Sequence, residues 1–346
     1  MERKYHPWGK SLRMTTHVAV TFDIEFDING AFGAPGKRTP RGALSLTGNA
    51  DQSSGLPAIL DTLDRHRVTA TFFVEALQAN WFGLDEMGGI VELLQSRGHE
   101  IQLHLHPVWL LFDDSDWASQ VVRDPPRSNT HDTLVNLSHD RVTEIIERGK
   151  ASFAAWGLPA PNAIRTGSLL VERHLYSAFR ECGMEVSSSV GLGIHKPEDP
   201  SIRLFQSPRC IDGVLEVPIS SYIGADHRFC QKTRLATLIG MGLAEQSAWL
   251  DQAEARQLPL LVLLSHVSEF HTPIGSDYRR NTLTERKFEQ LCSRLSESSS
   301  LRAVTISELA SIVDLNTDED DTPLTLPRWQ STLRFLEAAK QKVLRQ

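Results

Sequence analysis

Five short polar clusters in this sequence combine residue types that could bind a metal ion and catalyse hydrolysis. Each cluster lies at or just after an apolar run, where a buried strand would end. Loops at strand ends tolerate the polar groups that a core would exclude, and α/β enzymes assemble their sites there. We therefore expect one site built from several strands. In chain order, the clusters contain Asp23 with Glu25, His104 with His106, Arg165, Glu216, and His266 with Glu269.

The first two clusters predict a metal site. Residues two apart on a strand face the same side, so Asp23, Glu25 and Asp27 should converge. The same spacing should bring His104 and His106 together. Convergent carboxylates need a cation or a shared proton, and imidazole with carboxylate oxygen suits zinc, and also manganese, iron or cobalt. We expect one divalent ion per chain, with Zn²⁺ preferred to Co²⁺ or Mn²⁺ and a position left open for water.

Each cluster also has a purely structural explanation. An aspartate at a strand end often caps a helix, a pair of histidines is often a hydrogen-bonded pair, and a buried arginine often only neutralises an acid. Their joint occurrence on successive predicted strands favours a catalytic site, with a metal site without catalysis as the alternative.

Predicted strands and helices alternate along the chain. Strands are expected over residues 18–22, 70–74, 100–106, 162–170, 184–190, 214–219, 258–266 and 302–306. Helices are expected over residues 56–66, 89–98, 141–157, 173–183, 235–256 and 283–295. This alternation implies parallel strands with right-handed crossovers, in a barrel or a doubly wound sheet. A nucleotide-binding enzyme ranks last, because no Gly-rich phosphate loop follows the first strand.

The chain divides into three predicted parts. They are an N-terminal extension over residues 1–16, an α/β domain over residues 17–313, and an acidic linker with a C-terminal helix over residues 314–346. In that helix Trp329, Leu333, Leu336 and Val343 recur at helical spacing among basic residues. The helix is expected either to pack on the domain or to contact a membrane surface or a partner.

Charge and composition narrow the functional classes. The net charge of −7 offers no basic surface for a phosphate backbone, so nucleic acid is not an expected partner. The basic N-terminus precedes no apolar signal region, and no later run approaches the roughly 18 apolar residues of a membrane helix. Four scattered cysteines suggest neither disulfides nor a thiolate zinc site. We expect a cytoplasmic protein.

Successive motifs of the chain resemble those of the polysaccharide deacetylases (carbohydrate esterase family 4, the NodB-homology fold). The motifs are TFDIE, ATFFV, RGHEIQLHLHP, the Arg165 strand, ECGMEVSSSVG, LEVPIS, LLSHVSEF and RAVTISELA. The resemblance covers roughly residues 18–309 and implies a distorted (β/α)7 barrel with a divalent metal and an acid–base pair at its mouth.

The resemblance also implies roles for individual residues. Catalysis is expected from Asp23 as general base, His266 as general acid and Arg165 beside the base. The metal is expected to be bound by Glu25, His104 and His106. We expect Glu269 to keep His266 protonated, and Leu264, Trp109 and Glu216 to contact the substrate, with Leu264 in the acetyl-methyl pocket.

Three departures from the family pattern indicate a functional variant. Ile24 stands where most members have the metal-binding aspartate, so Glu25 must replace it. The two histidines are separated by one residue instead of three, and the third motif reads RTGS, without its usual prolines and aromatic residue. An acid two positions after the base and the HVSEF ending are similar to deacetylases of surface-polysaccharide assembly.

The expected function is metal-dependent removal of an N-acetyl group from an amino sugar in a polysaccharide or glycoconjugate precursor. One alternative is a related barrel hydrolase of a cyclic or other non-sugar amide. Another is a catalytically silent sugar-binding homologue, which Ile24 would support.

Overall fold

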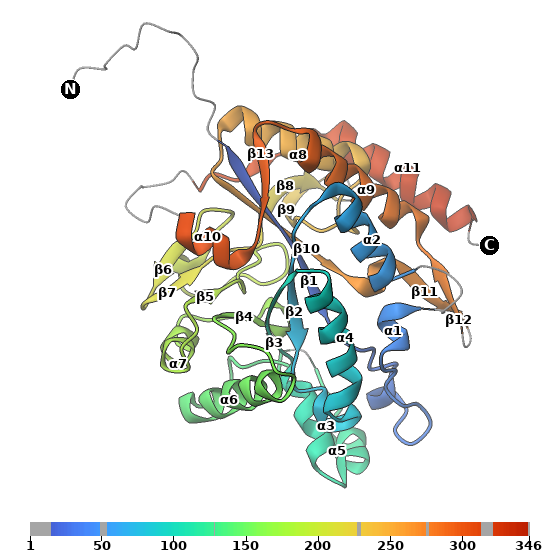
Figure 1. The fold of residues 1–346 in the computed structure, drawn as a ribbon, viewed down its shortest axis with the longest axis vertical. Coiled ribbons are helices and arrows are strands. Elements are labelled where there is room, and N and C mark those ends of the chain that lie inside the picture. The colour runs from blue at the N-terminus through green and yellow to red at the C-terminus, as the bar shows by residue number, and fades with distance from the viewer. Residues whose placement is uncertain are drawn as a thin grey trace, which may run out of the picture.

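A curled, mostly parallel β-sheet forms the centre of the protein, and helices surround it (Figure 1). The computed structural model describes residues 15–48, 54–127, 129–226, 230–274, 277–312 and 321–344. The sheet has the strand order β10-β1-β2-β3-β4-β5-β7-β6, and β13 pairs with the first half of β1. Among the described strands of this sheet, only β6 and β7 pair in an antiparallel way. This arrangement confirms the predicted distorted (β/α) barrel.

The strands of the main sheet occupy the segments that the apolar runs indicated. They are β1 (Thr16–Ile24), β2 (Thr71–Glu75), β3 (Glu100–Leu105), β4 (Ala163–Thr166), β5 (Val186–Ser187), β6 (Arg209–Ile211), β7 (Val214–Glu216), β10 (Leu260–His266) and β13 (Leu301–Val304).

Helices connect these strands and cover the outside of the sheet. They are α1 (Leu44–Thr47), α2 (Leu56–His66), α3 (Ala79–Phe82), α4 (Leu84–Ser96), α5 (Trp117–Arg123), α6 (His139–Ala155), α7 (Leu175–Glu181), α8 (Leu243–Arg256), α9 (Thr282–Glu297), α10 (Ile306–Ile312) and α11 (Arg328–Leu344). Short 3₁₀ turns are η1 (Ala31–Gly33), η2 (Pro107–Asp113), η3 (Gly167–Leu169), η4 (Pro200–Ile202) and η5 (Val267–Glu269).

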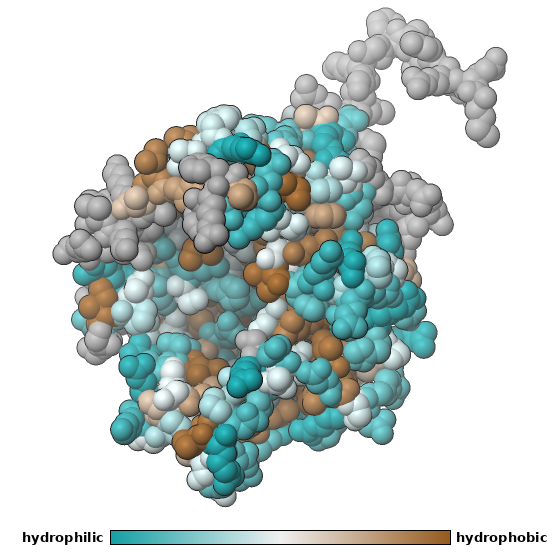
Figure 2. Space-filling view, turned by 180° about the vertical axis from the view of Figure 1, so that it is seen from behind, coloured by the Kyte–Doolittle hydropathy of each residue, from teal (hydrophilic) through white to brown (hydrophobic). Residues whose placement is uncertain are grey.

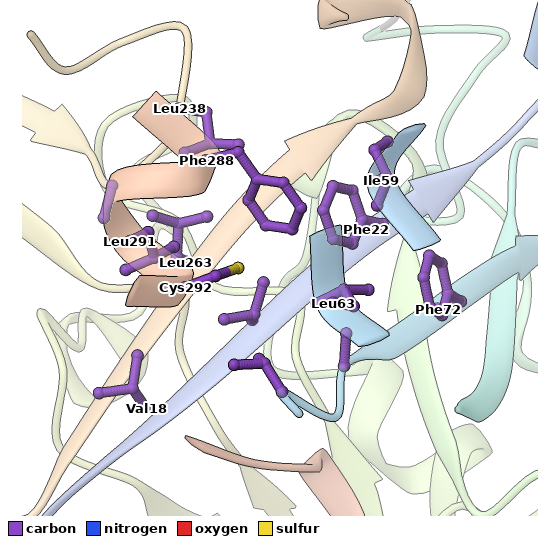
Figure 3. Packing of buried hydrophobic residues seen from close by; sticks show 14 of the residues in the cluster. Val18, Phe22, Ile59, Leu63, Phe72, Leu238, Leu263, Phe288, Leu291 and Cys292 are labelled. Atoms are coloured by element: carbon purple, nitrogen blue, oxygen red, sulfur yellow. The ribbon is translucent and has the colours of Figure 1, made fainter. Parts of the chain in front are cut away.

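Alternation along β1 divides its side chains between two environments. Val18 and Phe22 point outward, where Figure 3 shows them in the layer that α2 and α9 cover. Phe22 stacks on Phe72 with ring centroids 5.3 Å apart and meets Phe288 edge-on at 5.5 Å. The intervening residues, which include Ala19, point to the interior of the curled sheet. Asp23 has the interior parity, so the core that fixes Phe22 also aims Asp23 inward.

Two small sheets lie outside the barrel. One pairs β11 (His271–Ile274) with β12 (Asp277–Arg280), and the other has the order β14-β8-β9. In the second sheet β8 is Ser221–Ala225, β9 is Gln231–Leu235 and β14 is Leu324–Thr325. The main chain between β7 and β8 reaches β10, because Ser220 N donates to Val262 O at 3.0 Å. This contact brings the two edges of the curled sheet together.

The C-terminal segment is fastened to the domain before the last helix begins. The carboxylate of Asp321 accepts hydrogen bonds from the backbone N–H groups of Phe205, Gln206 and Ser207. β14 then pairs in parallel with β8. The predicted linker is therefore ordered over residues 321–327, whereas its acidic part up to residue 320 lies outside the described residues, as do residues 1–14 of the predicted extension.

Three predicted elements were wrong at their ends. The helix expected over residues 235–256 begins only at Leu243, because Leu235 ends β9 and Gly240 and Gly242 lie in the turn between them. The strand expected over residues 162–170 stops at Thr166, where Ser168 enters the left-handed region with φ 54° and forms η3. The strand expected over residues 184–190 is reduced to β5.

Across the described ranges, none of the helices is both long enough and apolar enough to cross a membrane.

Candidate active site

The predicted catalytic residues meet at the C-terminal ends of neighbouring strands. Asp23 at the end of β1 is in register with His266 at the end of β10. His104 near the end of β3 is in register with Arg165 on β4 and, on its other side, with Glu75 on β2. All five of these side chains point to the interior of the curled sheet, because apolar residues next to them in the chain pack in the outer layers. The fold thus converts five distant motifs into one cluster.

Glu25, His104 and His106 form a candidate metal site. One ligand atom from each lies within 4.8 Å of the other two. His104 Nδ1 lies 3.0 Å from the carbonyl oxygen of Arg165, which leaves the lone pair of Nε2 facing the cluster. That Nε2 is buried and has no hydrogen-bond partner in the described part of the chain. Burial also lowers the pKa of His104, which keeps it neutral. A buried, unpartnered imidazole nitrogen beside a carboxylate fits a divalent cation.

His106 is oriented by Asp132 and Glu75, two acids that the sequence analysis did not identify. Its Nδ1 lies 2.6 Å from Asp132 Oδ2, and its Nε2 lies 3.1 Å from Glu25 Oε2. Burial opposes the charged form of His106, but Asp132 and Glu25 raise its pKa well above the usual value. The carboxylate of Glu75 accepts a hydrogen bond from the backbone N–H of His106. These contacts fix the ring with Nε2 toward the candidate metal position.

Asp23 is arranged as a base with one oxygen committed and one available. Arg165 Nη1 donates to Asp23 Oδ1 at 2.6 Å. The other oxygen, Oδ2, lies 3.7 Å from His104 Nε2 and 3.7 Å from His266 Nε2. Burial by itself would raise the pKa of Asp23, but Arg165 and the two histidines outweigh it and lower the pKa below the usual value. Asp23 is therefore ionised at neutral pH, with Oδ2 facing the site.

Several contacts fix the position of Arg165 beside Asp23. Its side chain is fully buried, and its Nε and Nη2 donate to the carbonyl oxygen and the hydroxyl of Ser188 at 2.9 and 3.0 Å. The guanidinium also lies over the ring of Phe73, 4.0 Å from its centroid. These contacts fix the cation that lowers the pKa of Asp23.

His266 is arranged as an acid. Its Nδ1 lies 3.3 Å from Glu269 Oε1. Burial opposes protonation, but the hydrogen bond that His266 donates to Glu269 and the charges of Asp23 and Glu25 raise the pKa of His266 to about 9. Glu269 is itself positioned by the hydroxyl of Ser265, which donates to Oε2 at 2.9 Å. At neutral pH the site therefore contains an ionised Asp23 and a protonated His266.

Asp27 does not join the cluster, so the expectation that three carboxylates converge was wrong for this residue. β1 ends at Ile24, and strand alternation ends with it. Asp27 is exposed; its backbone forms a bridge to Arg41, and its Oδ1 accepts from Asn29 N at 2.6 Å. The side chain therefore stabilises the turn after β1.

The three residues predicted to contact substrate are all buried. Leu264 is 3% exposed and belongs to the barrel interior. Trp109 is 1% exposed and packs on Phe112 with ring centroids 5.5 Å apart. Glu216 is fully buried and accepts from Tyr176 Oη, Ser189 N and Val190 N. A role for these three in substrate contact stays a prediction, and the observed contacts of Glu216 support the turn after β5.

Comparisons with known proteins agree with this geometry. Residues 36–187 match the family model described as polysaccharide deacetylase, and this range includes His104, His106 and Arg165. Over this range the chain is similar to the polysaccharide deacetylases. No curated protein matches the chain.

Solved structures show that the family fold extends over almost the whole chain. A protein from Mycobacterium smegmatis described as a polysaccharide deacetylase has a TM-score of 0.53 and 16% identity, covering 94% of this chain and 98% of that chain. Puue allantoinase has a TM-score of 0.50 and 10% identity, covering 91% and 96%. At these identities the likeness shows the fold. Ile24 is fully buried in the outer core, and Glu25 joins the two histidines in the candidate metal site.

Proposed function

We propose that the protein is a metal-dependent hydrolase that removes the N-acetyl group from an amino sugar of a polysaccharide or glycoconjugate precursor. The observation that carries the proposal is the ionised Asp23 and protonated His266, 3.7 Å apart, beside the Glu25, His104 and His106 cluster. Amide hydrolysis needs a base for the attacking water and an acid for the leaving amine. The site contains both, in the protonation states that the first step requires.

The residues divide the reaction between them. Asp23 Oδ2 takes a proton from the water that adds to the acetyl carbonyl carbon, while Arg165 keeps Oδ1 occupied. His266 Nε2 faces the same space as Asp23 Oδ2 and gives its proton to the sugar nitrogen as the C–N bond breaks. Acetate and a free amino sugar result, with one water consumed.

Glu25, His104 and His106 would bind the divalent ion, for which zinc is the first choice. Such an ion supplies Lewis-acid polarisation of the carbonyl oxygen and lowers the pKa of water. Glu25 then takes the place of the aspartate that Ile24 replaces, and Asp132 and Glu75 maintain the orientation of His106.

A cavity of about 580 Å³ includes in its wall Thr133, which follows Asp132, the partner of His106, and offers room for the rest of the substrate. Amide, hydroxyl, imidazole and carboxylate groups line it, as sugar hydroxyls require. These lining groups include Asn129, Asn136, Glu172 and His195.

The test is a screen of N-acetylated sugar nucleotides, lipid-linked sugars and oligosaccharides for acetate release, with and without added zinc. Asp23→Asn and His266→Ala should each lower kcat roughly 10²–10⁴-fold with little change in KM, because both groups act in the transition state. Hydrolysis of a cyclic amide without acetate release would instead support the alternative amide hydrolase. Zinc and sugar binding without turnover would support the silent homologue. The cytoplasmic location stays an expectation from the sequence.

A further inference from the structure

The inner face of α11 is polar, and its hydrogen bonds fix the rotation of the helix. Ser331 Oγ donates to Glu245 Oε1 at 2.6 Å. The guanidinium of Arg334 donates to the carbonyl oxygens of Ala225 and Gly240 at 2.7 and 3.1 Å and lies 3.3 Å from Glu245 Oε2. Ser331, Arg334 and Glu245 are at most 7% exposed. Because buried polar groups must keep their partners, the helix cannot turn this face outward.

The outer face of α11 is apolar. Trp329, Leu333 and Leu336 are spaced four and three residues apart and form one stripe along the helix. Their exposed fractions are 60%, 39% and 61%. In Figure 2, hydrophobic side chains reach the surface at the upper left, where α11 lies. Single exposed leucines are ordinary, but an apolar stripe that includes a tryptophan indicates a contact surface. A helix on a domain surface usually packs its apolar face on the core, whereas α11 packs its polar face on the domain and exposes its apolar face.

The charge of the C-terminal segment indicates what this surface contacts. From residue 328 to the end, the sequence contains Arg328, Arg334, Lys340, Lys342 and Arg345, with Glu337 as its one acid. Arg334 is paired with Glu245, which leaves four basic residues on a chain whose net charge is −7. Tryptophan and leucine beside basic residues are the composition of helices that lie in the interface of an anionic bilayer. A second copy of the same cationic helix would be repelled.

We propose that α11 docks the enzyme on anionic lipid surfaces, with Trp329, Leu333 and Leu336 entering the boundary between headgroups and acyl chains. The basic residues supply long-range attraction, and the apolar stripe supplies the buried area. The contact is peripheral, and the polar inner face keeps α11 attached to the domain while it forms. The surface is independent of the proposed chemistry, so its test needs no substrate.

Vesicle sedimentation of the full-length protein tests the proposal. The wild type should sediment with phosphatidylcholine vesicles that contain phosphatidylglycerol, should not sediment with pure phosphatidylcholine, and should dissociate as salt is raised. Trp329→Ser/Leu333→Ser/Leu336→Ser should weaken binding about tenfold or more. The matched control is Val122→Ser/Ile194→Ser, because these side chains are 68% and 64% exposed on other elements and should not affect binding.

Three results would overturn the proposal. The first is wild-type protein that stays in the supernatant with anionic vesicles, and the second is a triple variant that sediments as well as the wild type. The third is a dimer, detected by light scattering, that the triple variant converts to monomer without any vesicle binding by the wild type. If the triple variant unfolds at a lower temperature than the wild type, Trp329→Ser alone should still weaken binding severalfold, because its side chain is mostly exposed.

Discussion

Glu269→Gln should change the pH dependence of the reaction more than its maximum rate. Glu269 Oε1 lies 3.3 Å from His266 Nδ1 and helps to raise the pKa of His266 to about 9 from its ordinary value of 6.5. Glutamine keeps the size of the side chain and can still accept a hydrogen bond from the Ser265 hydroxyl, but it removes the negative charge. The pKa of His266 should therefore fall, and the alkaline limb of the activity profile should move to lower pH.

The size of the effect follows from the two pKa values. At pH 8 a histidine with a pKa of about 9 is protonated in about 90% of molecules, and one with a pKa of 6.5 in about 3%. The variant should lose at most about 30-fold at pH 8 and less than about twofold at pH 6. The loss stays below this maximum because Asp23 and Glu25 also raise the pKa of His266. A bound divalent cation should move the alkaline limb of both proteins to lower pH, and the difference in pH between the two limbs should persist.

The assay is the pH profile of kcat/KM for acetate release by zinc-loaded wild type and variant. Glu92→Gln is a matched control, since this exposed glutamate of α4 lies outside the catalytic cluster and outside the cavity, and it should leave the limb in place. An equal loss of activity at every pH, with the limb unmoved, would refute the role of Glu269 as the group that keeps His266 protonated.

Three further changes test individual contacts. Asp132→Asn should weaken zinc binding about 10–100-fold, measured by competition with a chelator, because the carboxylate orients His106. Gly167→Ala should also lower zinc affinity, since the added Cβ would lie 2.6 Å from His106 Nδ1 and must displace the ring. Arg334→Met should lower the free energy of unfolding by about 3 kcal/mol in denaturant titrations, because Glu245 is fully buried and loses its cation.

Each of these changes has a matched control. Asp124→Asn removes a carboxylate that pairs with His131 outside the site, and it should leave zinc affinity unchanged. Gly89→Ala adds a Cβ to a helix where nothing lies within 4 Å. Arg328→Met removes an exposed charge from the same helix as Arg334 and should have little effect on unfolding. If a control matches its test variant, the corresponding contact is not the cause.

The sequence predicted the site well because strand alternation and strand ends determine where side chains point. Phe22 and Ile24 pack outward, so Asp23 must face the interior, and the same reasoning places His104 and Arg165. The alternation fails where a strand ends, and for that reason Asp27 was misplaced. The predicted roles of these residues stay predictions until variants are assayed.

Asp132 and Glu75 were missed for different reasons. Asp132 lies in a loop, and its contact with His106 spans 26 residues without any periodic pattern to indicate it. Glu75 ends a buried strand, ATFFVE, and could have been identified by the same rule that selected Asp23. The sequence also could not show which face of α11 contacts the domain. The apolar stripe marks one face of the helix, but it does not show whether that face or the polar face packs on the domain.

Hydrolysis of an N-acetyl group at a single divalent ion is tested most directly by titrating metal-free protein with zinc while acetate release is followed. The rate should rise until one zinc ion is bound per chain and then stay constant. His104→Ala should bind no zinc and release no acetate, whereas His99→Ala should keep both properties, since the His99 ring packs on Phe72 outside the site. Full acetate release by protein without zinc, or by His104→Ala, would contradict the proposed site.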